Sequence, residues 1–92
     1  MRIYTINFHS QALEDIKKLK KSDKNSFKKL EKLLVELQAH PYSGTGKPEQ
    51  LKYENKGEWS RRISQKHRLI YTVNDEEISV WVLAAQGHYA DK

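Results

Sequence analysis

Five polar side chains from separate segments of the chain could together act on a phosphodiester. They are Glu49, Arg62, Arg68, His88 and Tyr89. Cleavage of an RNA strand needs a base for the 2′-hydroxyl proton, positive charge at the phosphorane-like transition state, and an acid for the leaving 5′-oxygen. A carboxylate, arginines and an imidazole can fill these roles without a metal ion, and a tyrosine can stack on a nucleobase. The residue types therefore indicate RNA cleavage, provided that the fold brings the segments together.

Patterns typical of metal sites and of other catalytic motifs are absent from the sequence. There is no cysteine, which excludes a disulfide framework and a thiolate metal site. The four histidines show neither H-x-x-x-H nor H-E-x-x-H spacing, and there is no P-loop and no G-x-S-x-G. Local structure explains His9, beside a helix start, His40, beside a proline, and His67, on an apolar face. We expect no metal site and no cofactor.

The arginines lie in residues 58–73, which are predicted to form a β-hairpin because both halves have the composition of strands. The hairpin carries three arginines, Arg61, Arg62 and Arg68, which a half-buried sheet would not need for stability. If residues 64–66 form a three-residue loop, Arg62 lies opposite Arg68, and both side chains share one face. A two-residue turn would put them on opposite faces.

We favour the three-residue loop because it sorts the side chains by polarity. The face with the two arginines is then nearly all polar: Ser60, Arg62, Ser64, Lys66, Arg68, Ile70 and Thr72. The other face is mostly apolar: Trp59, Arg61, Ile63, His67, Leu69 and Tyr71. Two like charges directly opposite each other destabilise a bare sheet by roughly 0.2–1 kcal/mol. The pair therefore indicates either an anion-binding site or two solvated arginines on an open face.

Length and charge limit the class of protein. The 92 residues suit one domain spanning residues 1–92, with one modest core. No apolar run approaches the roughly 18 residues of a membrane helix, and no secretory signal is visible, so we expect a cytoplasmic protein without a membrane segment. The net charge of +5 either favours a polyanionic partner, nucleic acid first, or serves solubility. Eight lysines between residues 17 and 32 would form a solvated face or contact an RNA backbone.

Two helices in an antiparallel hairpin are expected after an N-terminal strand over residues 2–8. Ser10 is the expected N-cap of the first helix, whose apolar residues recur at helical spacing. Ser22 and Asp23 end this helix and cap the second. The second helix must stop near Ala39, because a proline follows two residues later.

The rest of the chain is predicted to be mainly strands. A short strand begins at Glu49, the hairpin follows, and residues 78–85 are apolar on both faces, which fits a central strand buried on both sides. Without the short strand, the order βααβββ predicts an α+β fold, with an antiparallel sheet and two helices packed on one face.

Four segments resemble the YoeB (Txe) branch of the RelE toxin superfamily, in order and spacing, across essentially the whole chain. They read G-K-P-E-Q-L-K over residues 46–52, W-S-R-R-I over 59–63, H-R-L-I-Y over 67–71 and H-Y over 88–89. The resemblance implies the toxin of a type II toxin–antitoxin pair, which enters the ribosomal A site and cuts the messenger RNA there. It also implies a microbial-RNase-like α+β sheet, in agreement with the predicted element order.

The same resemblance implies a role for each of the five side chains. Glu49 would be the general base and His88 the general acid. Arg68 would stabilise the transition-state phosphate, Arg62 would hold the scissile or adjacent phosphate, and Tyr89 would help to position the nucleotide. RNA contacts are also implied for two lysines that flank the base, Lys47 and Lys52. The expected products carry a 2′,3′-cyclic phosphate or 3′-phosphate and a free 5′-hydroxyl.

The implied partners are the ribosome, with its messenger RNA and 16S rRNA, and a YefM/Phd-like antitoxin whose disordered acidic tail folds over the basic cleft. Members of this family often form homodimers. The chain departs from the family where Ala90-Asp91-Lys92 follows the His-Tyr pair, and where Gln86-Gly87 replaces a basic residue of some members. Two other functions stay open: a non-catalytic module that binds RNA or protein, and a ParE-like gyrase inhibitor on the same scaffold.

Overall fold

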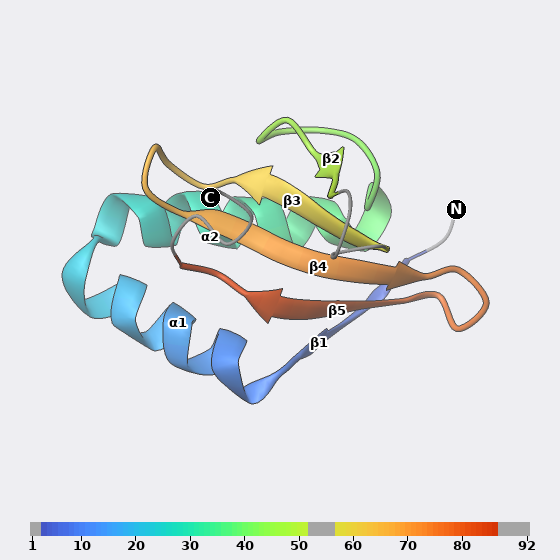
Figure 1. The fold of residues 1–92 in the computed structure, drawn as a ribbon, viewed down its shortest axis with the longest axis horizontal. Helices are drawn as coiled ribbons and strands as arrows, with labels where there is room; N and C mark the ends of the chain where they lie inside the picture. The colour runs from blue at the N-terminus through green and yellow to red at the C-terminus, as the bar shows by residue number, and fades with distance from the viewer. Residues whose placement is uncertain (1–2, 52–56, 87–92) are drawn as a thin grey trace.

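The computed structural model describes residues 3–51 and 57–86 of the chain. The helices are α1 (Ser10–Ser22) and α2 (Lys24–Ala39). The strands are β1 (Thr5–Phe8), β2 (Glu49–Gln50), β3 (Glu58–Arg62), β4 (Arg68–Asn74) and β5 (Ser79–Ala84). They form one five-stranded sheet in the order β1-β5-β4-β3-β2 (Figure 1). The predicted α+β class is confirmed, and the short strand at Glu49 is a separate β2.

The edge strand β1 makes the sheet mixed rather than wholly antiparallel. β1 runs parallel to β5, with Ile6 beside Val80 and Phe8 beside Val82, whereas the other neighbouring strands are antiparallel. The prediction of an antiparallel sheet was therefore wrong at this edge. A short turn imposes antiparallel pairing, but β1 and β5 are joined only through the long chain between them, so no turn sets their relative direction.

The two helices pack on one face of the sheet and share its core. The buried residues of this core include Leu19, Leu30, Leu33 and Leu37 from the helices and Tyr71, Val80 and Val82 from the sheet. Burial of such apolar side chains contributes about 1.5–3 kcal/mol each. No helix in the described residues is long and apolar enough to span a membrane.

The start of α2 follows the prediction, whereas the start of α1 does not. Asp23 accepts hydrogen bonds from the backbone N–H of Ser26 at 3.1 Å and from its hydroxyl at 2.8 Å. These bonds lower the pKa of Asp23. The prediction of Ser10 as N-cap was wrong by one position, since His9 is the cap and makes no side-chain cap hydrogen bond. The backbone of His9 is extended, as is usual for an N-cap residue, and Ser10 is already the first residue of the helix.

Strand β5 lies in the interior of the sheet, as predicted, but its two sides are not equally buried. Val80 and Val82 are fully buried, whereas Trp81 on the opposite face is 40% exposed. The Trp81 and His9 rings pack in a T-shaped arrangement, with 5.0 Å between ring centroids. The prediction of a strand buried on both sides was therefore wrong at Trp81, because the helices cover only the opposite face of the sheet, which an apolar run cannot reveal.

Asp15 of α1 fixes the chain just beyond β5. Its side chain is buried, and one carboxylate oxygen accepts the backbone N–H of Ala85 at 3.1 Å. The other oxygen accepts the side-chain amide of Gln11 at 2.9 Å. A helix residue thereby satisfies a backbone donor that the sheet leaves without a strand partner.

Candidate active site

The register of the sheet brings Glu49, Arg62 and Arg68 to one face. Arg62 lies directly opposite Arg68 in the β3–β4 hairpin, which confirms the predicted register. Glu49 lies opposite Ser60 in the β2–β3 pair. Opposite residues share a face, and residues two apart along a strand do so as well. The carboxylate and both guanidinium groups therefore belong to the side of the sheet that the helices leave uncovered.

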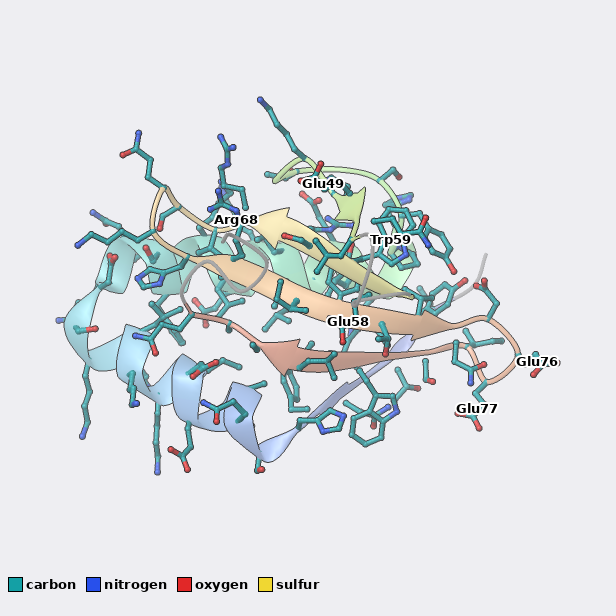
Figure 2. The ribbon with its side chains drawn as sticks, in the orientation of Figure 1. Glu49, Glu58, Trp59, Arg68, Glu76 and Glu77 are labelled. Atoms are coloured by element: carbon teal, nitrogen blue, oxygen red, sulfur yellow. The ribbon has the colours of Figure 1, made fainter. Side chains whose placement is uncertain are left out.

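These three side chains are accessible and are not paired with one another. Glu49 and Arg62 are exposed, and Arg68 is half-buried. The Nη1 of Arg68 donates to the backbone carbonyls of Ser64 at 2.8 Å and His67 at 3.2 Å, which holds this guanidinium at the hairpin turn (Figure 2). In the described part of the chain, no ion pair within 4.0 Å joins Glu49 to either arginine. Two cations and one anion on the same face give it a net positive charge, which favours the binding of a phosphate.

Of the other predicted site residues, the structure describes only Lys47. His88, Tyr89 and Lys52 lie outside the described residues, and so does the extension that contains Asp91. Lys47 is exposed two residues before Glu49 and has a positive φ of 50°. Over residues 3–51 and 57–86, no group of three or more His, Asp or Glu side chains could hold a metal ion.

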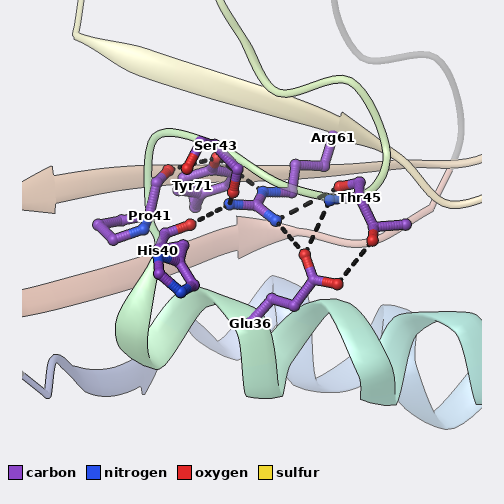
Figure 3. A network of polar contacts seen from close by, with 7 residues as sticks. All are labelled: Glu36, His40, Pro41, Ser43, Thr45, Arg61 and Tyr71. Carbon is purple, nitrogen blue, oxygen red and sulfur yellow. Dashed lines mark hydrogen bonds and ion pairs between the residues drawn. The ribbon is translucent and has the colours of Figure 1, made fainter.

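Arg61 is a buried structural residue that the sequence prediction missed. Its side chain is fully buried on the helix-facing side of β3. All five of its N–H groups have acceptors: Tyr71 Oη at 3.1 Å, Glu36 Oε1 at 3.1 Å, and the carbonyls of His40, Ser43 at 2.7 Å and Thr45 at 3.3 Å (Figure 3). The expectation that the hairpin needs none of its arginines for stability was therefore wrong for Arg61.

Glu36 of α2 completes this network from the side of the helices. Its Oε1 accepts the backbone N–H of Thr45 at 2.8 Å, and its Oε2 accepts the Thr45 hydroxyl at 2.6 Å. The hydrogen bonds from Thr45, helped by the charge of Arg61, hold the pKa of Glu36 below its usual value. The Tyr71 hydroxyl donates to the Pro41 carbonyl at 2.8 Å, and burial raises the pKa of this tyrosine while Arg61 opposes the rise.

One signal for this network was present in the sequence. Arg61 falls on the mostly apolar face of the hairpin, where a charged group needs several buried partners. The partners at Glu36 and Thr45 lie 25 and 16 residues earlier in the chain. The need for partners was therefore predictable, but their identity was not.

Two glycines allow the loop between α2 and β2, residues 40–48, to pass close to β3. Gly44 and Gly46 have φ values of +116° and +88°, which other residues rarely adopt. The Gly46 carbonyl accepts the backbone N–H of Arg62 at 2.7 Å. A Cβ on Gly46 would lie 2.9 Å from the Arg62 carbonyl oxygen, which is too close. The loop is thus joined to β3 immediately before Lys47 and Glu49.

Replacing Tyr71 with phenylalanine should destabilise the protein by about 1–3 kcal/mol. The ring still fills the core, but the Arg61 Nε and the Pro41 carbonyl both lose a buried hydrogen-bond partner. Urea unfolding followed by circular dichroism measures the change. Tyr42→Phe is the matched control, because Tyr42 is 41% exposed and its hydroxyl binds Asp75 at the surface. An equal loss in both variants would contradict a special role for the Tyr71 hydroxyl.

Comparison with known proteins identifies the family. Residues 8–89 match the family described as "YoeB-like toxin of bacterial type II toxin-antitoxin system". The chain is 40% identical to Toxin YoeB of Mycobacterium bovis over 85 residues, which cover 92% of this chain and 98% of that protein. The YoeB-YefM complex from Staphylococcus aureus contains a chain that is 38% identical, with a TM-score of 0.80 and coverage of 94% and 98%. A YoeB dimer from the same organism is 39% identical, with a TM-score of 0.82 and the same coverage. The chain therefore belongs to the YoeB-like toxins of bacterial type II toxin–antitoxin systems.

Proposed function

We propose that this toxin is an endoribonuclease that cuts messenger RNA in the ribosomal A site. The observation that carries the proposal is the placement of Glu49, Arg62 and Arg68 on one face of the sheet, opposite to the face that the helices cover. A proton acceptor beside two cations provides two of the three functions that attack by a 2′-hydroxyl requires. The resemblance to the RelE superfamily implies the same reaction and supplies the third function, the acid, at His88.

In the proposed reaction, Glu49 takes the proton of the 2′-hydroxyl, and the oxygen attacks the adjacent phosphorus. Negative charge develops on the phosphate oxygens, where Arg68 and Arg62 stabilise it. His88 protonates the 5′-oxygen as its bond to phosphorus breaks, and Tyr89 positions the nucleotide. The products are a 2′,3′-cyclic phosphate and a free 5′-hydroxyl. None of these steps needs a metal ion.

The arrangement of the two arginines favours a phosphate site over a solvated face. Direct opposition of Arg62 and Arg68 costs roughly 0.2–1 kcal/mol in the free protein. A phosphate bound between the two guanidinium groups is attracted to both of them, and its negative charge offsets their mutual repulsion. Arg68 is also held by two backbone carbonyls, so little of its side-chain freedom is lost when a phosphate binds.

We infer that the basic surface also makes the contacts to the ribosome and to the antitoxin. The net charge is +5, and seven of the eight lysines between residues 17 and 32 are exposed. Such a surface suits 16S rRNA and messenger RNA, and in the sequence Lys47 and Lys52 flank the proposed base. It also suits the acidic tail of a YefM/Phd-like antitoxin. The Staphylococcus aureus relatives were solved as a YoeB-YefM complex and as a dimer, which supports an antitoxin and a homodimer for this chain as well.

The products of cleavage test the proposal directly. The purified toxin should cut a message bound to ribosomes with an empty A site and leave the same message intact when ribosomes are omitted. The downstream fragment should carry a 5′-hydroxyl, which polynucleotide kinase labels without prior phosphatase treatment. The upstream fragment should end in a 2′,3′-cyclic phosphate or its 3′-phosphate.

Three other results would each reject this proposal. A 5′-phosphate on the downstream fragment would show a different nucleolytic mechanism. Salt-sensitive RNA binding without any product on programmed ribosomes would indicate a binding module. Poisoning of gyrase without cleavage of RNA would indicate a gyrase inhibitor on the same scaffold.

A further inference from the structure

The position of Glu49 depends on the loop that precedes it, because β2 is very short. β2 consists of Glu49–Gln50 only, whereas strands usually contain about 3–10 residues. Beyond β2, the backbone N–H of Leu51 donates to the Glu58 carbonyl at 2.8 Å. Before it, the carbonyl of Gly46 binds the N–H of Arg62 at 2.7 Å. A shift of the loop at this point would move the Glu49 carboxylate over the face of the sheet.

Glu36 joins this loop to helix α2. Its carboxylate binds the Thr45 backbone N–H at 2.8 Å and the Thr45 hydroxyl at 2.6 Å, and it lies 3.1 Å from Arg61 Nη1. Thr45 directly precedes Gly46, the residue whose carbonyl binds β3. Figure 3 shows the contact of Glu36 with Thr45. From Thr45 the chain continues through Gly46, which binds β3, to the segment that carries Glu49.

We propose that Glu36 is a positioning residue for RNA cleavage, which acts through Thr45 and the loop to hold Glu49 where it can meet the 2′-hydroxyl. This inference rests on the proposed function of Glu49 as the base. Glu36 itself contacts the loop from the helix side of the sheet, away from the face that carries Arg62 and Arg68. Its removal should therefore lower the rate of the cleavage step more than the affinity for programmed ribosomes.

The test compares three variants, of which two weaken the contact to different extents and one preserves it. Glu36→Ala removes the bonds to both Thr45 and Arg61, Thr45→Val removes only the hydroxyl bond, and Thr45→Ser keeps it. Because a shift of about 1 Å can cost up to 10²-fold, Glu36→Ala should lower the single-turnover rate constant by roughly 10- to 100-fold. Thr45→Val should lose less, and Thr45→Ser should match the wild type. The toxin concentration at half-maximal rate should stay unchanged.

Glu31→Ala is the matched control for these measurements. Glu31 is an exposed glutamate on the same helix, and its removal should leave cleavage at the wild-type rate. Thermal unfolding of each variant, followed by circular dichroism, checks that the protein is folded at the assay temperature. Thr45→Val keeps the test available if Glu36→Ala fails to fold.

A double-mutant cycle with Glu49→Gln separates positioning from a general structural role. If Glu36 acts through the base, Glu36→Ala should have little further effect once Glu49 is glutamine. An equal fold-loss in both backgrounds would overturn the inference, as would full activity in folded Glu36→Ala and Thr45→Val. Wild-type cleavage by Glu49→Gln would instead overturn the assignment of Glu49 as the base, and with it the positioning role, whereas a wild-type protein that cuts no message on programmed ribosomes would overturn the proposed function.

Discussion

Glu49→Gln should lower the single-turnover rate of message cleavage by about 10²–10⁴-fold, the usual contribution of a general base. The glutamine keeps the shape of the side chain but cannot take the 2′-hydroxyl proton. The corresponding rise of the activation barrier is about 3–5 kcal/mol. Because Glu49 is exposed and its backbone pairs opposite Ser60, the substitution should leave the fold intact. Quenched time courses on ribosomes with an empty A site, with toxin in excess, measure the rate.

Glu76→Gln is the matched control for this prediction. It makes the same change of charge at an exposed glutamate in the turn between β4 and β5, far from Glu49 (Figure 2). This variant should cut at the wild-type rate and should be as stable as the wild type. If Glu49→Gln also cuts at that rate, the proton acceptor lies elsewhere, and the face with Arg62 and Arg68 is a phosphate-binding surface only.

The hairpin register was predictable because a slip of one residue moves every side chain to the other face. Only one of the two candidate loops placed Leu69 and Tyr71 toward the helices with Arg62 and Arg68 on the opposite side, and the structure has this register. The position of Glu49 on the same face was not predictable in this way. The loop before Glu49 contacts β3 through Arg61 and through the Gly46 carbonyl, and these contacts join residues far apart in the chain.

Features that depend on contacts between distant segments could not be predicted from the local sequence pattern. The parallel pairing of β1 with β5 and the exposure of Trp81 both follow from how the layers are assembled, which alternation along a strand does not encode. The residue types indicated only that an imidazole and a tyrosine could take part, and the resemblance to a toxin family implied the particular roles of His88 and Tyr89. Both residues lie outside the described part of the chain, so their roles stay predictions.

Arg61 and Arg62 are adjacent in β3 but should respond to substitution in opposite ways. They belong to opposite faces of the strand, since side chains alternate. Arg61 is fully buried and uses every N–H group, whereas Arg62 is exposed and lies opposite Arg68. The arrangement of Arg61 is typical of a residue that stabilises the fold, and that of Arg62 is typical of a residue whose charge is available to a ligand.

Arg61→Met should lower the free energy of unfolding by about 3–5 kcal/mol, as expected when one partner of a buried pair is removed. The loss should fall at the lower end, because the Glu36 side chain is 32% exposed and water can reach it. Arg62→Gln should change the same free energy by less than about 1 kcal/mol, and in the stabilising direction, because it relieves the repulsion from Arg68. Urea unfolding of the two variants side by side measures both values.

The difference in unfolding free energy between Arg61→Met and Arg62→Gln shows whether the Arg61 network or the hydrogen bonds to β3 hold the loop before Glu49. A small domain has about 5–15 kcal/mol of stability in total, so a loss of this size in Arg61→Met would consume much of it. Arg61→Met would then show that the loop before Glu49 is held by a buried guanidinium whose partners span α2, the loop and β4. If instead Arg61→Met unfolds at the same urea concentration as Arg62→Gln, the network adds no stability. In that case, hydrogen bonds to β3 alone must hold the loop in place.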